Sequence, residues 1–366
     1  LLGYKTYADF KLEKNMAKTP ETVNKFLADL WEPALKQSKE EVAEMQKIID
    51  AEGENFKLAG WDWWYYAEKV KKEKYSLDEE MLRPYFKMEN VRQGAFDVAS
   101  KLYGIQFVKR DDISVYQPDV EVYEVKESDG THIGILYTDY YPRSGKRAGA
   151  WMSNFRSQSN MDGEFITPHI VNVGNFSKPT EGKPALLSFD EVETLFHEFG
   201  HGLNGLFTNT NYPGSRRAPV DFTELPSQIM ENWASHPEVL KMYAKHYQTG
   251  ETIPDELIEK IINSRHFNKG FETVEYLAAS ILDMDWHTVT DVTNVDVQKF
   301  EAESLSKIGL IPEIASRYQS TNFNHIFGGD GYSAGYYGYM WSGVLDSDAF
   351  GAFLENGLFD KATAES

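Results

Sequence analysis

The sequence contains no cysteine, no long apolar run and comparatively few basic residues. The absence of Cys from all 366 residues excludes disulfides, thiolate metal sites and a cysteine nucleophile. No run reaches about 18 apolar residues, so no membrane-spanning helix is predicted. Lys and Arg total 37 against 57 Asp and Glu, and the formal net charge is −20. Nucleic acid and anionic membrane surfaces both favour basic proteins, so neither is expected as a partner.

The remaining composition is that of a globular protein. Hydrophobic residues make up 41% of the chain and aromatic residues 14%, enough for a substantial core. Apolar residues repeat at helical spacing from Thr19-Pro-Glu-Thr22 to about Tyr103. The same spacing returns over residues 254–263, 271–289 and 295–310. The predicted fold class is therefore mainly α.

One short motif carries strong chemical information, because residues 197–201 read His-Glu-Phe-Gly-His. In a helix, His197 and His201 lie on one face and can bind one zinc ion, while Glu198 faces the open position of the metal. A capping box at Ser188-Phe-Asp-Glu191 predicts where this helix begins. Its predicted apolar stripe consists of Val192, Phe196, Phe199, Leu203 and Leu206. This combination is typical of zinc peptidases.

A catalytic zinc ion needs a third protein ligand and keeps its fourth position for water. The segment after the motif offers Glu224 and Glu231, one heptad apart, and spacing alone does not choose between them. Glu193 precedes His197 by one helical turn. We predict that Glu193 accepts the spare ring N–H of His197, a contact that fixes the tautomer of a zinc ligand.

A small β-sheet is predicted beside the motif helix. Residues 120–125 and 133–138 alternate with period two around Ser128-Asp-Gly-Thr131, which predicts a hairpin. A third extended run covers residues 168–176. In zinc peptidases generally, an edge strand in this position pairs with the extended substrate. The third run is therefore either such an edge strand or a purely structural one.

A second group of candidate residues lies near the end of the chain. It begins at His325 and continues through a glycine-rich stretch to Tyr332, Tyr336 and Tyr339. If a helix begins near Tyr332, these three phenols share one face. Phenols are neutral donors near pH 7, and the oxyanion formed in amide hydrolysis needs such donors. The other interpretation of these rings is that they fill an aromatic core.

These motifs together resemble the thimet oligopeptidase family of zinc metallopeptidases. The resemblance rests on Phe196–His201, Asp221-Phe-Thr-Glu-Leu-Pro-Ser-Gln228 and Gly335-Tyr-Tyr-Gly-Tyr339. Within the family, the likeness is to bacterial peptidyl-dipeptidases, also called dipeptidyl carboxypeptidases. The segments that carry this likeness are Gly149–Phe155, Gln158-Ser159, Glu231–Pro237, Phe267–Gly270 and His325–Gly329.

The resemblance implies a zincin-like, mainly helical catalytic domain with one Zn²⁺ per chain. The implied zinc ligands are His197, His201 and Glu224, with Glu198 as the general base and Glu193 supporting a ligand. The resemblance also implies roles for residues of the tyrosine loop. His325, Tyr332 and Tyr339 would bind the substrate backbone and stabilise the transition state, with Tyr336 lining the same loop.

The activity that the resemblance implies is release of C-terminal dipeptides from short unfolded peptides. An endo-acting oligopeptidase with the same zinc site is the alternative, and a non-catalytic peptide-binding module is a third hypothesis. Dipeptide release requires a cation or a cluster of donors that captures the free carboxylate two residues past the cleaved bond. The candidates are Arg143, Lys146, Arg147, Arg216 and Arg217. Two loops differ from the usual peptidyl-dipeptidase pattern, one through an added Asp330 and one at residues 213–219, so side-chain preference is not predicted.

By the same resemblance, residues 1–366 form the C-terminal catalytic domain of a longer protease. We expect a helical region over residues 1–118, a small β-rich region over 119–184, and the zinc-binding helices with the tyrosine loop over 185–366. The first residues contain no initiator Met, which agrees with a fragment. We expect a monomer that acts on short peptides in the cytoplasm, or in the periplasm if a signal precedes this sequence.

Overall fold

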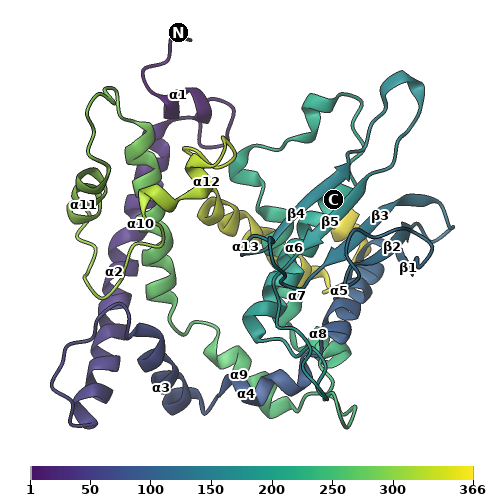
Figure 1. Ribbon diagram of the computed structural model, residues 1–366, viewed down its shortest axis with the longest axis horizontal. Helices are drawn as coiled ribbons and strands as arrows, with labels where there is room; N and C mark the ends of the chain where they lie inside the picture. The colour runs from purple at the N-terminus through teal and green to yellow at the C-terminus, as the bar shows by residue number, and fades with distance from the viewer. Residues whose placement is uncertain (1, 366) are drawn as a thin grey trace. The chain divides into compact units, whose positions relative to one another are not determined.

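The computed structural model describes residues 2–365, so Leu1 and Ser366, the ends of the predicted domain, lie outside it. The chain divides into two compact units, each assembled from segments that are far apart in the sequence. Unit 1 comprises Leu1–Asp78, Pro219–Thr223 and Asn263–Ser342. Unit 2 comprises Glu79–Ala218, Glu224–Ile262 and Gly343–Ser366. Figure 1 labels the helices and strands of both.

Unit 1 is helical in its described residues, and two long helices that pack along each other form its centre (Figure 1). These are α2 (Pro20–Ala51) and α10 (Lys269–His287). The side chain of Thr19 caps α2 by accepting a hydrogen bond from the backbone N–H of Thr22, as the sequence predicts. The other helices are α1 (Tyr7–Leu12), α3 (Trp63–Tyr75), α11 (Val297–Lys307), α12 (Asn324–Phe327) and the start of α13 (Gly338–Asn356).

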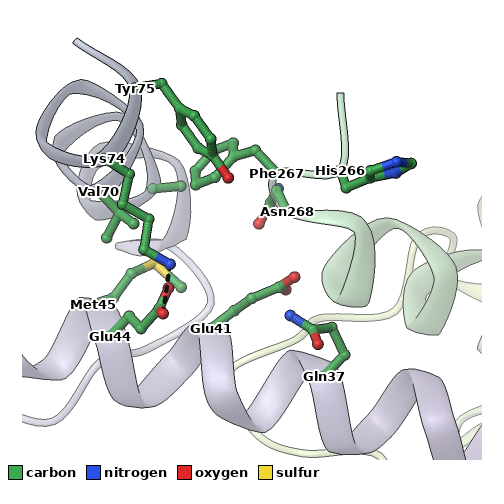
Figure 2. A pocket seen from close by; sticks show the side chains of 11 residues that line it. Gln37, Glu41, Glu44, Met45, Val70, Lys74, Tyr75, His266, Phe267 and Asn268 are labelled. Carbon is green, nitrogen blue, oxygen red and sulfur yellow. Dashed lines mark hydrogen bonds and ion pairs between the residues drawn. The ribbon is translucent and has the colours of Figure 1, made fainter. Parts of the chain in front are cut away.

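Glu41 of α2 holds the first turn of α10. Its carboxylate accepts hydrogen bonds from the backbone N–H groups of Gly270 and Phe271, both at 2.8 Å. These N–H groups lie in the first turn of a helix and have no partner inside it. Figure 2 shows Glu41 reaching from α2 toward this turn, beside the ion pair of Glu44 with Lys74. One buried carboxylate thus joins the two long helices.

In the described residues of unit 2, five strands form one sheet in the order β1-β2-β3-β5-β4. The strands are β1 (Gln106–Lys109), β2 (Glu121–Lys126), β3 (His132–Asp139), β4 (Trp151–Arg156) and β5 (His169–Val173). The predicted hairpin is the antiparallel pair β2 and β3, with Gly130 at φ 91° in its turn. β5 pairs parallel with β3 and antiparallel with β4.

Three details of this sheet were left open by the sequence or differ from the expectation. The third extended run becomes β5, which lies between β3 and β4 and is therefore not an edge strand. The edge beside it is β4, which the sequence did not predict because its six residues do not alternate between polar and apolar. In addition, β1 begins at Gln106, inside the segment 1–118 that we expected to be helical.

The sheet of unit 2 packs against α6 (Phe189–Leu206), which carries the His-Glu-Phe-Gly-His motif (Figure 1). Both reciprocal hydrogen bonds of the Ser188–Glu191 capping box are present. All five residues of the predicted apolar stripe are buried. The prediction of a mainly α fold, with a small sheet beside this helix, is confirmed.

The other helices of unit 2 surround α6 and the sheet. They are α4 (Glu79–Leu82), α5 (Met88–Tyr103), α7 (Leu225–Ser235), α8 (Pro237–Tyr243), α9 (Asp255–Ser264), the later part of α13, and α14 (Lys361–Glu365). Short 3-10 helices occupy Arg83–Tyr85, Met161–Gly163 and Pro213–Arg216 in unit 2, and Val220–Phe222 and Ser320–Asn322 in unit 1. Among residues 2–365, no helix combines the length and the apolar character needed to cross a membrane.

We predict that Glu41→Ala lowers the free energy of unfolding by about 1.5–3 kcal/mol, because two helix N–H groups lose a charged acceptor. The measurement is urea denaturation followed by circular dichroism. Glu40→Ala, one residue earlier on the exposed face of α2, is the matched control. It should change the stability by less than about 0.5 kcal/mol. Equal stability of the two variants would contradict the capping role of Glu41.

Candidate metal centre and tyrosine cluster

The motif helix α6 places both histidines on one side, as their spacing predicts. The rings of His197 and His201 have centroids 5.0 Å apart and are nearly perpendicular, at 86°. Asn172 of β5 donates a hydrogen bond from Nδ2 to the backbone carbonyl of Glu198, at 2.6 Å. The sheet therefore fixes the position of α6 at the motif itself.

A very close approach of α7 brings a third ligand to the histidines. Gly200 lies between them, and a Cβ atom built on it would be 2.2 Å from the carbonyl oxygen of Pro226. The same Cβ would be 2.7 Å from the Cα of Ser227. Only glycine permits this contact, because the opposing atoms belong to the backbone. Glu224 lies directly before the first residue of α7.

The carboxylate of Glu224 meets both histidines. Its Oε2 lies 3.3 Å from Nε2 of His197 and 3.1 Å from Nε2 of His201. Ser227 donates a hydrogen bond from its hydroxyl to the same Oε2, at 3.0 Å, which fixes the carboxylate. Ligand atoms of His197, His201 and Glu224 all lie within 4.8 Å of one another, so this group could hold a metal ion. Of the two glutamates that spacing left open, the structure places Glu224 in the ligand group.

Glu231, the other candidate, lies on the far side of His197. Its Oε1 is 2.6 Å from Nδ1 of that histidine. A carboxylate at Nδ1 leaves Nε2 as the lone-pair nitrogen that can bind a metal. The sequence predicted such a partner but assigned it to Glu193. The structure gives this contact to Glu231, and the role of Glu193 stays a prediction.

The electrostatics of the group favour a cation at its centre. Burial alone would raise the pKa of Glu224, but hydrogen bonds to His197 and His201 hold it well below its usual range. Burial also lowers the pKa of His197, yet its contacts with Glu224 and Glu231 reverse this and raise the pKa to about 10. Two carboxylates therefore flank the His197 ring. A metal ion bound at this group would replace the imidazole proton that compensates their negative charge.

Glu198 is buried beside the candidate metal group but is not one of its three residues. Its side chain is 7% exposed, and its Oε2 is buried without a hydrogen-bond partner among the described residues. Burial raises the pKa of Glu198, and the neighbouring His197 and His201 act in the opposite direction. A carboxyl group with a raised pKa beside a metal site is suited to accepting and returning a proton.

The second group of predicted residues forms an aromatic cluster within unit 1. The ring of His325 lies 5.9 Å from Tyr332, 5.4 Å from Tyr336 and 6.4 Å from Tyr339, between centroids. The rings of Tyr332 and Tyr339 stack at 5.3 Å. Tyr336 is 1% exposed and packs on Phe323, so it also contributes to a local core. All four predicted residues are therefore neighbours.

The backbone that carries this cluster is a turn and not the expected helix. We expected a helix from about Tyr332, whereas α13 begins at Gly338. Ala334 has a φ of 50°, in the left-handed region that a helix cannot contain. The tyrosines consequently meet through this turn and not through helical spacing.

Three of the candidate cations bind other groups of the protein, and one of them is Arg216, whose Nη1 donates to the backbone carbonyl of Gln158 at 3.0 Å. Arg143 donates hydrogen bonds from Nη1 and Nη2 to the buried carboxylate of Asp139, at 2.6 and 2.8 Å. Lys146 donates to the same carboxylate at 3.0 Å and is itself almost fully buried. Arg143 and Lys146 therefore fix the segment that follows β3.

The sequence pattern of peptidase family M3 matches residues 1–366. The chain belongs to peptidase family M3. Dipeptidyl carboxypeptidases of Salmonella typhimurium and Escherichia coli are each 45% identical over 362 residues, covering 98% of this chain. Oligopeptidase A of Escherichia coli is 38% identical over 371 residues and covers the whole chain. The predicted family resemblance is confirmed.

The family M3 relatives are longer than this chain. The matched part is 53% of each dipeptidyl carboxypeptidase and 54% of oligopeptidase A. The chain thus spans about half the length of the curated relatives it matches. These relatives include dipeptidyl carboxypeptidases, whose name matches the predicted activity, and an oligopeptidase, whose name matches the alternative.

We predict that Gly200→Ala weakens metal binding, because the added methyl group forces α6 and α7 apart and moves Glu224 from the histidines. Overpacking of this kind typically destabilises a protein by about 1–3 kcal/mol. Metal content after dialysis against a weak chelator, with the thermal midpoint, is the measurement. Gly351→Ala in α13 is the control, since a Cβ there would meet nothing within 4 Å. Full metal content in Gly200→Ala would show that the close approach is not required.

Proposed function

We propose that this chain is the catalytic part of a zinc metallopeptidase that cleaves short peptides and releases C-terminal dipeptides. The observation that carries the proposal is the convergence of Glu224 on the Nε2 atoms of His197 and His201, with the carboxyl group of Glu198 beside them. Membership of family M3 and the names of the relatives support the reaction class.

Zinc is the metal that fits this donor set best. Two imidazole nitrogens and one carboxylate oxygen are typical of catalytic zinc sites with one position open for water. Ligand atoms about 2.1 Å from a tetrahedral ion lie about 3.4 Å from each other. The distances from Glu224 Oε2 to the two Nε2 atoms, 3.3 and 3.1 Å, are close to this spacing. Small movements of His197, His201 and Glu224 would complete the site.

In the proposed reaction, a bound zinc ion supplies a Lewis acid that activates water and polarises the scissile carbonyl. His197, His201 and Glu224 would hold the ion. Glu198 would accept the proton of the attacking water at its buried carboxylate and later return it to the leaving amine. Glu231, at Nδ1 of His197, would keep the ring in the orientation that directs Nε2 toward Glu224.

The tyrosine cluster supplies neutral donors in this proposal. Tyr332 and Tyr339 would hold the oxyanion, and His325 and Tyr336 would line the substrate site. Removal of one such donor typically raises the barrier by about 2.7–4 kcal/mol. The clustering of these side chains within unit 1 supports a shared role.

Release of dipeptides, in contrast to internal cleavage, depends on capture of the substrate carboxylate. Because Arg143 and Lys146 are bound to Asp139, and Arg216 to the backbone carbonyl of Gln158, the remaining predicted candidates are Arg147 and Arg217. Arg147 lies over the ring of Trp151 at the start of the edge strand β4, at 5.3 Å. Arg217 is exposed. The edge strand β4, in place of β5, is the strand that an extended substrate would join.

We predict that Glu198→Gln binds zinc like the parent chain but lowers kcat by about 100- to 10,000-fold, the usual effect of removing a general base. Elemental analysis gives the zinc content, and chromatography of a digested peptide gives the rate. Asp190→Asn, at an exposed position of the same helix, separates loss of the base from loss of any carboxylate on α6. A fully active Glu198→Gln chain would contradict the assignment of Glu198 as the general base. Zinc binding without turnover in the parent chain would instead support a non-catalytic peptide-binding module.

We predict that amidation of the C-terminus of a peptide substrate lowers kcat/KM by about 10- to 100-fold. Hydrogen bonds to a charged group contribute about 1.5–3 kcal/mol, and each 1.4 kcal/mol corresponds to tenfold. Mass spectrometry of the products shows whether a dipeptide leaves from the free acid. Acetylation of the N-terminus of the same peptide is the control and should have no effect. Equal rates, with cleavage inside the peptide, would establish the endo-acting alternative.

A further inference from the structure

A buried aspartate lies beneath the turn that carries the tyrosines. Asp283 belongs to α10, is 0% exposed, and has no part in the metal site. Its carboxylate faces the backbone between Tyr332 and Tyr339. This placement concerns unit 1 alone, so the argument depends only on contacts inside that unit.

Three successive backbone N–H groups donate to this one carboxylate. Ala334 N donates to Oδ1, and Gly335 N and Tyr336 N donate to Oδ2, each at 2.9 Å. Consecutive N–H groups that converge in this way form a concave anion site. Convergence requires Ala334 to adopt its φ of 50°, which is unfavourable for a residue with a side chain. The aspartate therefore stabilises a backbone conformation that the turn would not adopt alone.

A histidine on the same helix fixes the carboxylate. Nδ1 of His287 lies 2.7 Å from Oδ1 of Asp283, one helical turn away. The ring of His287 is in turn packed against Tyr7 of α1, with centroids 5.2 Å apart. Asp283 is thus held in one orientation by its neighbour while it binds the turn.

The same turn also determines the position of His325. The hydroxyl of Ser333 donates to the backbone carbonyl of Ile326 in α12, at 2.6 Å, and α12 carries His325. Tyr332 precedes the turn and Tyr339 follows it. The three tyrosines of the aromatic cluster are therefore in or next to the turn that Asp283 binds. His325 is linked to the same turn through the hydrogen bond from Ser333 to Ile326.

We propose that Asp283 is a positioning residue, which sets the Tyr332–Tyr339 turn in the conformation that presents its phenols for catalysis. This inference rests on the proposed function, because it assigns the phenols to the reaction. Asp283 does not act on substrate itself. A purely structural role would make Asp283 equivalent to any other buried residue of α10, and the two roles differ in their kinetic consequences.

The first test is Asp283→Asn, which has nearly the same shape. The amide oxygen can accept two of the three N–H groups, while its NH₂ group faces the third. Displacement of catalytic groups by about 1 Å typically lowers rates by about 100-fold. We expect kcat to fall by about 10- to 100-fold, with zinc content unchanged and KM within about threefold.

The decisive test combines Asp283→Asn with Tyr339→Phe. If Asp283 acts through the tyrosines, the effects of the two substitutions on kcat are not additive. Once the Tyr339 hydroxyl has been removed, displacement of the turn by Asp283→Asn no longer moves that donor. We expect Asp283→Asn to lower kcat by less than about threefold in the Tyr339→Phe background. Leu277→Ala is the matched control, because Leu277 lies on the same helix and is 0% exposed, but its apolar side chain cannot accept hydrogen bonds from the turn. It should lower the thermal midpoint and change kcat by the same small factor in both backgrounds.

If Asp283→Asn does not fold, a milder substitution at His287 provides the same test. His287→Leu keeps the three backbone hydrogen bonds but releases the carboxylate from its neighbour, so a smaller loss of kcat with the same non-additivity is expected. Unchanged kcat in Asp283→Asn, or an equal loss in both backgrounds, would overturn the inference and leave the proposed function intact. Absence of turnover in the zinc-loaded parent chain would refute the proposed function, and the inference with it.

Discussion

The metal site depends on one steric constraint, the contact between α6 and α7 at Gly200. A side chain at this position would collide with backbone atoms of Pro226 and Ser227. Without the contact, the residue before α7 could not reach the histidines of α6. Glu224 is 1% exposed, and its carboxylate depends on the same contact for its partners. Gly200, which has no side chain, thus allows His197, His201 and Glu224 to come together.

Buried carboxylates organise much of the molecule, and each is matched to several donors. Glu224 is held by two histidines and Ser227, Glu41 by the first turn of α10, and Asp283 by the tyrosine turn. A buried charge is tolerated when hydrogen bonds replace its lost hydration. Asp221, also 0% exposed, accepts hydrogen bonds from two backbone N–H groups and the Tyr337 hydroxyl. The acidic composition therefore has an internal role as well as a surface one.

The parts of the structure that follow from local sequence were predictable. The capping box, the apolar stripe of α6 and the hairpin of β2 and β3 depend on neighbouring residues, whose spacing the sequence displays. His197 and His201 share a helix face for the same reason. Glu224 could be chosen over Glu231 only through the family motif, because both glutamates lie at equivalent spacing.

The parts that depend on distant contacts were not predictable from spacing. The partner of His197 Nδ1 is set by the packing of α7 on α6, which places Glu231 there. β4 is a strand because β5 pairs with it, although its residues lack alternation. The turn before α13 departs from a helix because Asp283, far back in the chain, binds its N–H groups. Each difference arises where a long-range partner overrides local preference.

Asp221 accepts hydrogen bonds from the backbone N–H groups of Met16 and Ala17, which precede it in the sequence by 205 and 204 positions. These two residues are therefore synthesised long before Asp221. A contact of such high sequence separation can form only after the whole intervening segment has been made. The three residues of the candidate metal group are all present once Glu224 has been made, whereas the tyrosine cluster needs residues up to Tyr339. A growing chain therefore contains the three residues that could hold a metal ion before the tyrosine turn exists. Ribosomal synthesis thus makes the candidate metal group first and the aromatic cluster around His325 afterwards.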